Sequence, residues 1–150
     1  VTRLNDFKQQ SSFHQKNSVA VHVRRGDFLN KNAGTKALEM DFYKKAVPLF
    51  EEKVKDPDYF VFPDDTEWVR KEIGSLLPNA LYVADYHLSD SEEFVLMKEC
   101  RHAIIGNSTF SWFSALLSYS DSKIVYYSND WKNEYLNKDA HICPKEWFGI

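Results

Sequence analysis

The chain has 150 residues, 43% of them hydrophobic and 15% aromatic, and a formal net charge of -3 at pH 7. This length and composition predict one globular domain with a buried core, and they exclude a disordered chain. The weak negative charge argues against attraction of the whole molecule to nucleic acid or to an anionic membrane. Any anion-binding site must therefore be local.

The cysteine content and the hydropathy of the sequence indicate the kind of cellular compartment in which the protein resides. The two cysteines, Cys100 and Cys143, are too few for a disulfide framework. No apolar run approaches the length of a membrane span, and no signal peptide opens the sequence. These features favour a soluble protein in a reducing compartment, with the alternative that a targeting segment has been removed.

Helix and strand patterns alternate along the chain after a polar start. Residues 1–17 are polar and weakly patterned, so we expect an arm or linker that leads into a domain over 18–150. Short runs rich in β-branched and aromatic residues predict five strands, at 19–23, 59–62, 81–84, 102–106 and 123–127. Amphipathic or apolar stretches predict helices at 39–54, 66–77, 90–100 and 108–120.

Two of these helices and the tail carry further expectations. Pro48 should kink or split the helix over 39–54, because its ring clashes with the preceding turn. The helix over 108–120 is apolar almost all round, so it should be deeply buried. The aromatic tail after Tyr127 should be partly helical and should pack back on the sheet.

The alternation of short apolar strands with helices predicts a doubly wound α/β domain, whose mostly parallel sheet of about five strands is covered on both faces. In such a sheet, ligands bind beyond the carboxyl ends of the strands. Polar residues follow four of the expected strands and should gather at that edge, at 24–27, 63–65, 84–85 and 106–109.

The strand over 19–23 ends in two adjacent arginines, Arg24 and Arg25, followed by a glycine and Asp27. Paired guanidiniums can present forked donors to a phosphate or diphosphate. Asp27 could orient one arginine or act as a base. A structural ion pair between an arginine and Asp27 or Asp85 is an alternative that these residues alone leave equally open.

A second candidate phosphate site lies where Asn107, Ser108 and Thr109 open the helix over 108–120. A helix N-terminus carries unpaired N–H groups and a partial positive charge, so it binds phosphate readily, and hydroxyls there add donors. Simple capping of the helix by Asn107 or Ser108 is the alternative interpretation.

Acidic residues at the same edge have competing interpretations. Asp64 and Asp65 could be metal ligands, or Asp65 could only cap the next helix. No third hard ligand shares a clear spacing with them, so we expect no dedicated metal site. Asp90 and Glu93 have the spacing of a capping box. The sequence lacks a Walker loop, a dinucleotide-binding glycine fingerprint and a CxxC pair, which excludes nucleotide binding by those routes.

Three segments carry a resemblance to a known family: HVRRGD at 22–27, FPDDTEWV at 62–69 and LMKECRHAIIGNSTFSWFSALL at 96–117. In this order they resemble the α-1,2-fucosyltransferases of glycosyltransferase family 11. The ending PKEWFGI is similar to the C-terminus of that family, so the resemblance runs from about Val19 to the end of the chain. The chain departs from the family's pattern at Pro63, at Gly106 and at Phe113-Ser114.

The resemblance implies two Rossmann-like domains of the GT-B type with the active site between them. This chain would be the second domain, which binds GDP-fucose, and the acceptor-side N-terminal domain would be missing. The family is inverting and needs no metal or other cofactor. Fucose would pass from GDP-β-L-fucose to a galactose-containing glycan.

The resemblance also implies roles for residues around the diphosphate. Arg24 and Arg25 would hold the pyrophosphate and stabilise its charge as GDP departs. Ser108 and Thr109 would bind the same phosphates from the other side, with Asn107 beside them as a further substrate contact.

The remaining roles concern the sugar and the nucleoside. His22 and Asp27 would position the arginines or the sugar, and Asp27 is the candidate general base, with a base in the missing domain as the alternative. Asp65 and Glu93 are weaker candidates for contacts to ribose or guanine.

Three interpretations follow from these residues. The first is the donor half of an α-1,2-fucosyltransferase, and the second is a stand-alone nucleotide-sugar-binding module without transferase activity. A general phosphate-binding regulatory domain ranks last, because it requires the long match to be accidental. We expect no nucleic-acid partner. The cytoplasm of a bacterium is the favoured location, with membrane association left open and the Golgi as the alternative for a truncated eukaryotic type II protein.

Overall fold

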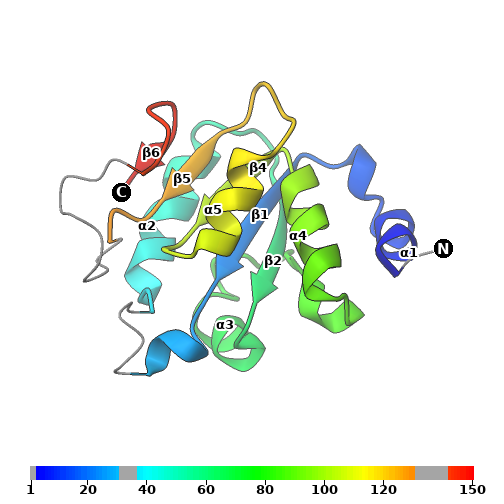
Figure 1. Ribbon diagram of the computed structural model, residues 1–150, viewed down its shortest axis with the longest axis horizontal. Coiled ribbons are helices and arrows are strands. Elements are labelled where there is room, and N and C mark those ends of the chain that lie inside the picture. The colour runs from blue at the N-terminus through cyan, green and yellow to red at the C-terminus, as the bar shows by residue number, and fades with distance from the viewer. Residues whose placement is uncertain (1–2, 31–36, 131–141) are drawn as a thin grey trace.

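The computed structural model describes residues 3–30, 37–130 and 142–150. These residues form a sheet of six parallel strands in the order β3-β2-β1-β4-β5-β6, with helices on both faces (Figure 1). The doubly wound α/β fold predicted from the sequence is confirmed, with one strand more than expected. The strands are β1 (Ser18–Val23), β2 (Asp58–Pro63), β3 (Leu81–Tyr82), β4 (His102–Ile105), β5 (Val125–Tyr127) and β6 (Phe148–Gly149).

The central strand β1 pairs with β2 on one side and with β4 on the other. All six of its residues are buried, because helices cover both faces of the sheet. Strand order runs outward as 1-2-3 on one side of β1 and as 4-5-6 on the other. The order therefore reverses between β1 and β4, and doubly wound domains have a crevice for ligands at the carboxyl end of such a position.

Two helical layers enclose the sheet. Phe50 of α2 and Val69 of α3 belong to the core on one face. Phe7 of α1, Leu96 of α4 and Ala115 of α5 belong to the core on the other. Figure 1 shows α4 and α5 in front of the sheet and α2 behind it. The helices are α1 (Arg3–Gln10), α2 (Met40–Glu51), α3 (Thr66–Glu72), α4 (Asp90–Glu99) and α5 (Thr109–Leu116), with short 3-10 helices η1 (Phe13–Gln15), η2 (Asp27–Leu29) and η3 (Val83–Tyr86).

The polar N-terminal segment differs from the expected arm. It contains α1 and η1, and it buries Leu4, Phe7 and Phe13 in the same core as α4. The Phe7 ring meets the rings of Phe60 and Tyr86 edge to face. Three apolar side chains in a polar stretch make too weak a periodic signal to reveal this packing from the sequence.

The expectation that the helix over 108–120 is deeply buried is wrong. In α5 the residues against the sheet are small, and Ser111 and Ser114 are fully buried. Their hydroxyls donate to backbone carbonyls three residues earlier, at 3.1 and 2.9 Å. Some of the large side chains are exposed instead: Phe113 is 48% exposed and Leu117 51%. Even so, none of the described helices is both long and apolar enough to cross a membrane.

Two helix caps were predicted, one of them correctly. Asp65 caps α3 by accepting a hydrogen bond of 3.1 Å from the backbone N–H of Trp68. The capping box of α4 lies one residue earlier than expected, at Ser89 and Glu92. This shift leaves the Glu93 side chain outside the box.

Smaller differences concern element lengths. Pro48 does not split α2, which continues to Glu51. The expected strand over 81–84 is a strand only at 81–82 and then turns into η3. The tail contributes β6, which pairs with β5 as expected of a segment that packs back on the sheet. The tail after Tyr127 was also expected to be partly helical, and its residues 131–141 lie outside the described part of the chain.

Candidate functional site

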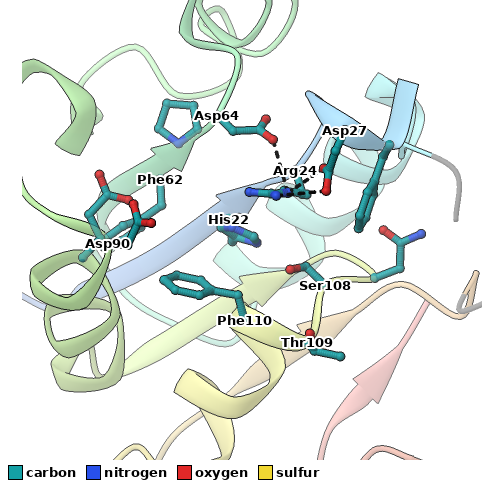
Figure 2. A pocket seen from close by; sticks show the side chains of 13 residues that line it. His22, Arg24, Asp27, Phe62, Asp64, Asp90, Ser108, Thr109 and Phe110 are labelled. Carbon is teal, nitrogen blue, oxygen red and sulfur yellow. Dashed lines mark hydrogen bonds and ion pairs between the residues drawn. The ribbon is translucent and has the colours of Figure 1, made fainter. Parts of the chain in front are cut away.

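A cavity of about 640 Å³ opens at the carboxyl ends of β1, β2 and β4 (Figure 2). It lies where the strand order reverses, as the fold predicts. The strands and the segments that follow them supply His22, Arg24, Asp27, Phe28, Phe62, Pro63 and Asp64, α4 supplies Asp90 and Glu93, and the start of α5 supplies Asn107, Ser108, Thr109 and Phe110.

Arg24 is the cation of this cavity and is held by two carboxylates. Its Nε and Nη2 donate to Asp27 Oδ1 and Oδ2 at 2.9 and 3.1 Å. Asp64 Oδ2 lies 3.4 Å from the same Nε. The hydrogen bonds between Arg24 and Asp27 raise the pKa of the guanidinium and lower the pKa of the carboxyl. The ion pair considered as an alternative thus exists, yet Arg24 stays 41% exposed at the cavity wall.

The Arg25 side chain points away from the cavity. Its guanidinium carbon stacks 3.8 Å from the centre of the Trp68 ring, and its Nε is 3.9 Å from Asp65 Oδ2. Successive residues of an extended chain face opposite sides, so adjacent arginines cannot readily share one cavity. The structure therefore brings Arg24, and not Arg25, to the site predicted for both.

The side chains of the two aspartates after β2 likewise lie in different places. The Asp65 carboxylate caps α3 next to Arg25 and does not line the cavity. The Asp64 carboxylate does line it, and accepts hydrogen bonds from the backbone N–H groups of Arg25 and Gly26 at 2.7 and 2.9 Å. The sequence analysis named Asp65 as a candidate contact, whereas the structure places Asp64 in the cavity wall.

His22 lies deep in the cavity wall and is 6% exposed. Burial, and then the neighbouring charge of Arg24, lowers the pKa of its imidazole from 6.5 to about 3. The ring is therefore neutral at physiological pH and too weakly basic to serve as a general base there. Its Nδ1 has no hydrogen-bond partner among the described residues, and its ring centre is 5.8 Å from that of Phe110.

Glu93 projects from α4 into the cavity beside Asp90. Burial, and then the charge of Asp90, raises the pKa of the Glu93 carboxyl to about 7. In the view of Figure 2, Asp90 lies on the α4 side of the cavity, and Asp27 and Ser108 lie toward the opposite side. Arg24 lies between Asp90 and these two residues. One end of the cavity thus holds the carboxyl groups of Asp90 and Glu93, and the other holds the guanidinium of Arg24 with the carboxylates of Asp27 and Asp64.

The start of α5 forms the wall below Arg24. Ser108 is the N-cap residue, but its side chain makes no capping hydrogen bond among the described residues. The Asn107 amide donates to the backbone carbonyl of Asp130 at 3.2 Å. Because Ser108 does not cap α5 among the described residues, the first N–H groups of the helix are able to bind an anion.

Several wall residues were not proposed as substrate contacts from the sequence: Asp64, which was considered only as a metal ligand, Asp90, which was considered only for a capping box, and Phe28, Phe62 and Phe110. The signal for Asp64 was present, because it directly follows a strand end. The aromatic residues gave no signal that distinguishes a cavity wall from a core. Among the described residues, no three His, Cys, Asp or Glu side chains are grouped so that they could hold a metal ion.

A parallel sheet with this strand order, and a polar cavity at its switch point, defines a Rossmann-like α/β domain. The chain belongs to glycosyl transferase family 11, whose family model matches residues 4–150. This match confirms the family resemblance seen in the three sequence segments.

Named relatives are similar over most of this chain. It is 33% identical over 136 residues to the O-antigen biosynthesis glycosyltransferase WbnK of Escherichia coli, covering 88% of this chain and 39% of the relative. It is 31% identical over 139 residues to an alpha-1,2-colitosyltransferase of Escherichia coli, covering 89% and 48%. It is 30% identical over 142 residues to galactoside alpha-(1,2)-fucosyltransferase 1 of Saimiri boliviensis boliviensis, covering 88% and 38%.

The chain therefore spans less than half the length of these relatives. No solved structure matches it.

Proposed function

We propose that this chain is the donor-binding part of an inverting α-1,2-fucosyltransferase, which transfers L-fucose from GDP-β-L-fucose to a galactoside without a metal ion. The observation that carries the proposal is the cavity, where Arg24 and the start of α5, whose N-cap residue makes no capping hydrogen bond among the described residues, face one space. Membership of glycosyl transferase family 11 and the names of the relatives support glycosyl transfer, and two of those names specify the α-1,2 linkage.

The charge distribution in the cavity suits a nucleoside diphosphate bound in one direction. The diphosphate would lie between Arg24 and the N-terminus of α5, where a guanidinium and backbone N–H groups stabilise negative charge. The nucleoside would extend toward Glu93, where a carboxylate can accept hydrogen bonds from ribose hydroxyls or guanine N–H groups. The opposite orientation would place the phosphates against Asp90 and Glu93, away from Arg24 and from the N-terminus of α5.

The proposed reaction is a single displacement. The acceptor hydroxyl oxygen forms a bond to the anomeric carbon of fucose, the bond from that carbon to the phosphate oxygen breaks, and GDP departs with the electron pair. Arg24 stabilises the charge that grows on the departing diphosphate, so its contribution is largest in the transition state. A general base takes the acceptor proton.

Asp27 is the candidate base within this chain. Its hydrogen bonds to Arg24 lower its pKa, which makes it a weak base while that ion pair lasts. A base from the part of the relatives that this chain does not span is the second candidate.

Calorimetry with GDP in the presence of EDTA tests the diphosphate contact. Arg24→Ala should weaken binding by roughly tenfold or more, because it removes a charge-assisted hydrogen-bond donor. Arg70→Ala is the matched control: Arg70 also forms a two-bond pair with a carboxylate, Asp85, but it lies outside the cavity. Equal GDP affinity in wild type and Arg24→Ala would refute the diphosphate role.

A stand-alone nucleotide-sugar-binding module is the second candidate function, since the cavity by itself offers contacts for a nucleoside diphosphate. We expect the chain alone to bind GDP and GDP-fucose but to transfer little fucose to lactose. Efficient transfer by this chain would exclude the module and would show that the acceptor site lies within it.

A further inference from the structure

We infer that Asp64 is a positioning residue for the proposed donor site: it holds the turn after β1 and thereby keeps Arg24 directed into the cavity. This inference rests on the proposed function, because it assigns a purpose to Arg24. Asp64 lies 40 residues after Arg24 in the sequence and reaches it only because β1 and β2 are neighbours.

Asp64 is linked to the end of β1 through backbone and side chain. Its backbone N–H donates to the Val23 carbonyl at 3.2 Å, which continues the pairing of β1 with β2. Its two carboxylate oxygens accept from the N–H groups of Arg25 and Gly26 at 2.7 and 2.9 Å. Three hydrogen bonds, two of them to its carboxylate, therefore connect Asp64 to the residues that flank or follow Arg24.

Gly26 allows this close approach. A Cβ atom at position 26 would lie 3.2 Å from Asp64 Oδ2, closer than most such contacts in proteins. A side chain there would have to displace the carboxylate or the turn. Glycine at this position thus serves the contact with Asp64.

The two carboxylates around Arg24 differ in how firmly they are held. The Asp64 side chain is 23% exposed and is fixed by the backbone bonds, and Oδ2 is 3.4 Å from Arg24 Nε. The Asp27 side chain is 59% exposed, on the short helix η2. An entering diphosphate could replace Asp27 at the guanidinium, since an exposed carboxylate is readily rehydrated. Replacing Asp64 would instead leave two backbone N–H groups unpaired.

The test combines GDP affinity with amide hydrogen exchange on the 150-residue chain. Asp64→Asn should weaken GDP binding by roughly tenfold, because one hydrogen bond to the backbone is lost and the turn no longer holds Arg24 toward the cavity. In the Arg24→Ala background the same change should have little further effect, since Asp64 acts through Arg24. A merely structural role would instead reduce affinity equally in both backgrounds, and this result would overturn the inference.

Two variants serve as controls. Asp85→Asn removes a carboxylate from the Arg70 pair outside the cavity, and it should leave GDP affinity unchanged. Asp27→Asn should not weaken GDP binding, because Asp27 competes with the phosphate for Arg24. A loss as large as that of Asp64→Asn would contradict the distinction between the two carboxylates.

Amide exchange separates failure of this inference from failure of the proposed function. The Arg25 and Gly26 amides should exchange slowly in wild type and at least roughly tenfold faster in Asp64→Asn. Unchanged exchange would overturn the inference even if GDP binds. A wild-type chain that binds no GDP would refute the proposed donor site, and the role of Asp64 toward a phosphate with it, whatever the exchange rates.

Discussion

At the residue scale, the carboxyl groups that line the cavity differ in their partners and in their protonation, because their surroundings differ. The carboxylate of Asp27 is paired with a guanidinium, whereas Asp64 accepts backbone N–H groups. Glu93 is half-buried beside Asp90. Burial and the Asp90 charge both raise the pKa of its carboxyl group. Burial disfavours the charged form, so Glu93 is the carboxyl group whose charge changes near neutral pH.

The pH dependence of stability tests this state of Glu93. Its folded-state pKa of about 7 lies above the ordinary value of 4.5, so the folded chain binds the proton more tightly than the unfolded chain. The stabilisation from this proton is complete below pH 4.5 and is lost as pH rises through about 7. Thermal unfolding should therefore show wild type losing stability relative to Glu93→Gln across this interval. A difference in Tm that does not vary with pH would contradict the raised pKa.

At the element scale, α5 shows that small residues can determine which side of a helix faces a sheet. Buried serines at 111 and 114 allow close approach, and their hydroxyls are satisfied by carbonyls of the same helix. Hydrophobicity alone predicts the opposite orientation, because it assigns Phe113 and Leu117 to the core. Close packing and satisfied hydrogen bonds outweigh the exposure of a few apolar side chains here.

A pair of substitutions in α5 tests this orientation. Ser114→Leu should reduce the free energy of unfolding by about 1–3 kcal/mol, because the added atoms have no room against the sheet. Leu117→Ser should change it by only about 0.5 kcal/mol, because that side chain is half exposed. Urea unfolding of both variants provides the measurement. The reverse ranking would mean that the apolar side of α5 is the buried one.

At the scale of the whole molecule, the N-terminal segment is part of the folded unit. Contacts of α1 with α4 attach it to one helical layer, and an ion pair between Lys8 and Glu99 joins the same two helices. The packing of Phe7 against Phe60 connects this segment to β2 as well. Residues 3–17 therefore contribute to the stability of the domain that carries the cavity.

Substitution of Phe7 tests this integration. Phe7→Ala should reduce the free energy of unfolding by about 3–5 kcal/mol, because the ring is 1% exposed and leaves a cavity when removed. Phe113→Ala removes the same atoms from a ring that is 48% exposed, and it should reduce the free energy by no more than about 1 kcal/mol. Similar losses in the two variants would show that α1 is not packed into the core.

The amino-acid sequence by itself determined the α/β class, most of the strands, the cap at Asp65 and the edge of the sheet where the cavity lies. These depend on local patterns: strand and helix periodicity, capping residues, and the rule that ligands bind beyond the carboxyl ends of parallel strands. The segment HVRRGD and the helix start at Ser108 are accordingly candidates on the sequence alone.

Only the tertiary structure decided which of two adjacent side chains faces the cavity. Arg24 was separated from Arg25, and Asp64 from Asp65, by the direction of the backbone where β1 and β2 end. A shift of one residue reverses the side of an extended chain, and local sequence patterns do not resolve strand ends to one residue. The same limit applies to α1 and α5, where the buried side depends on the shape of a partner that lies far away in the sequence.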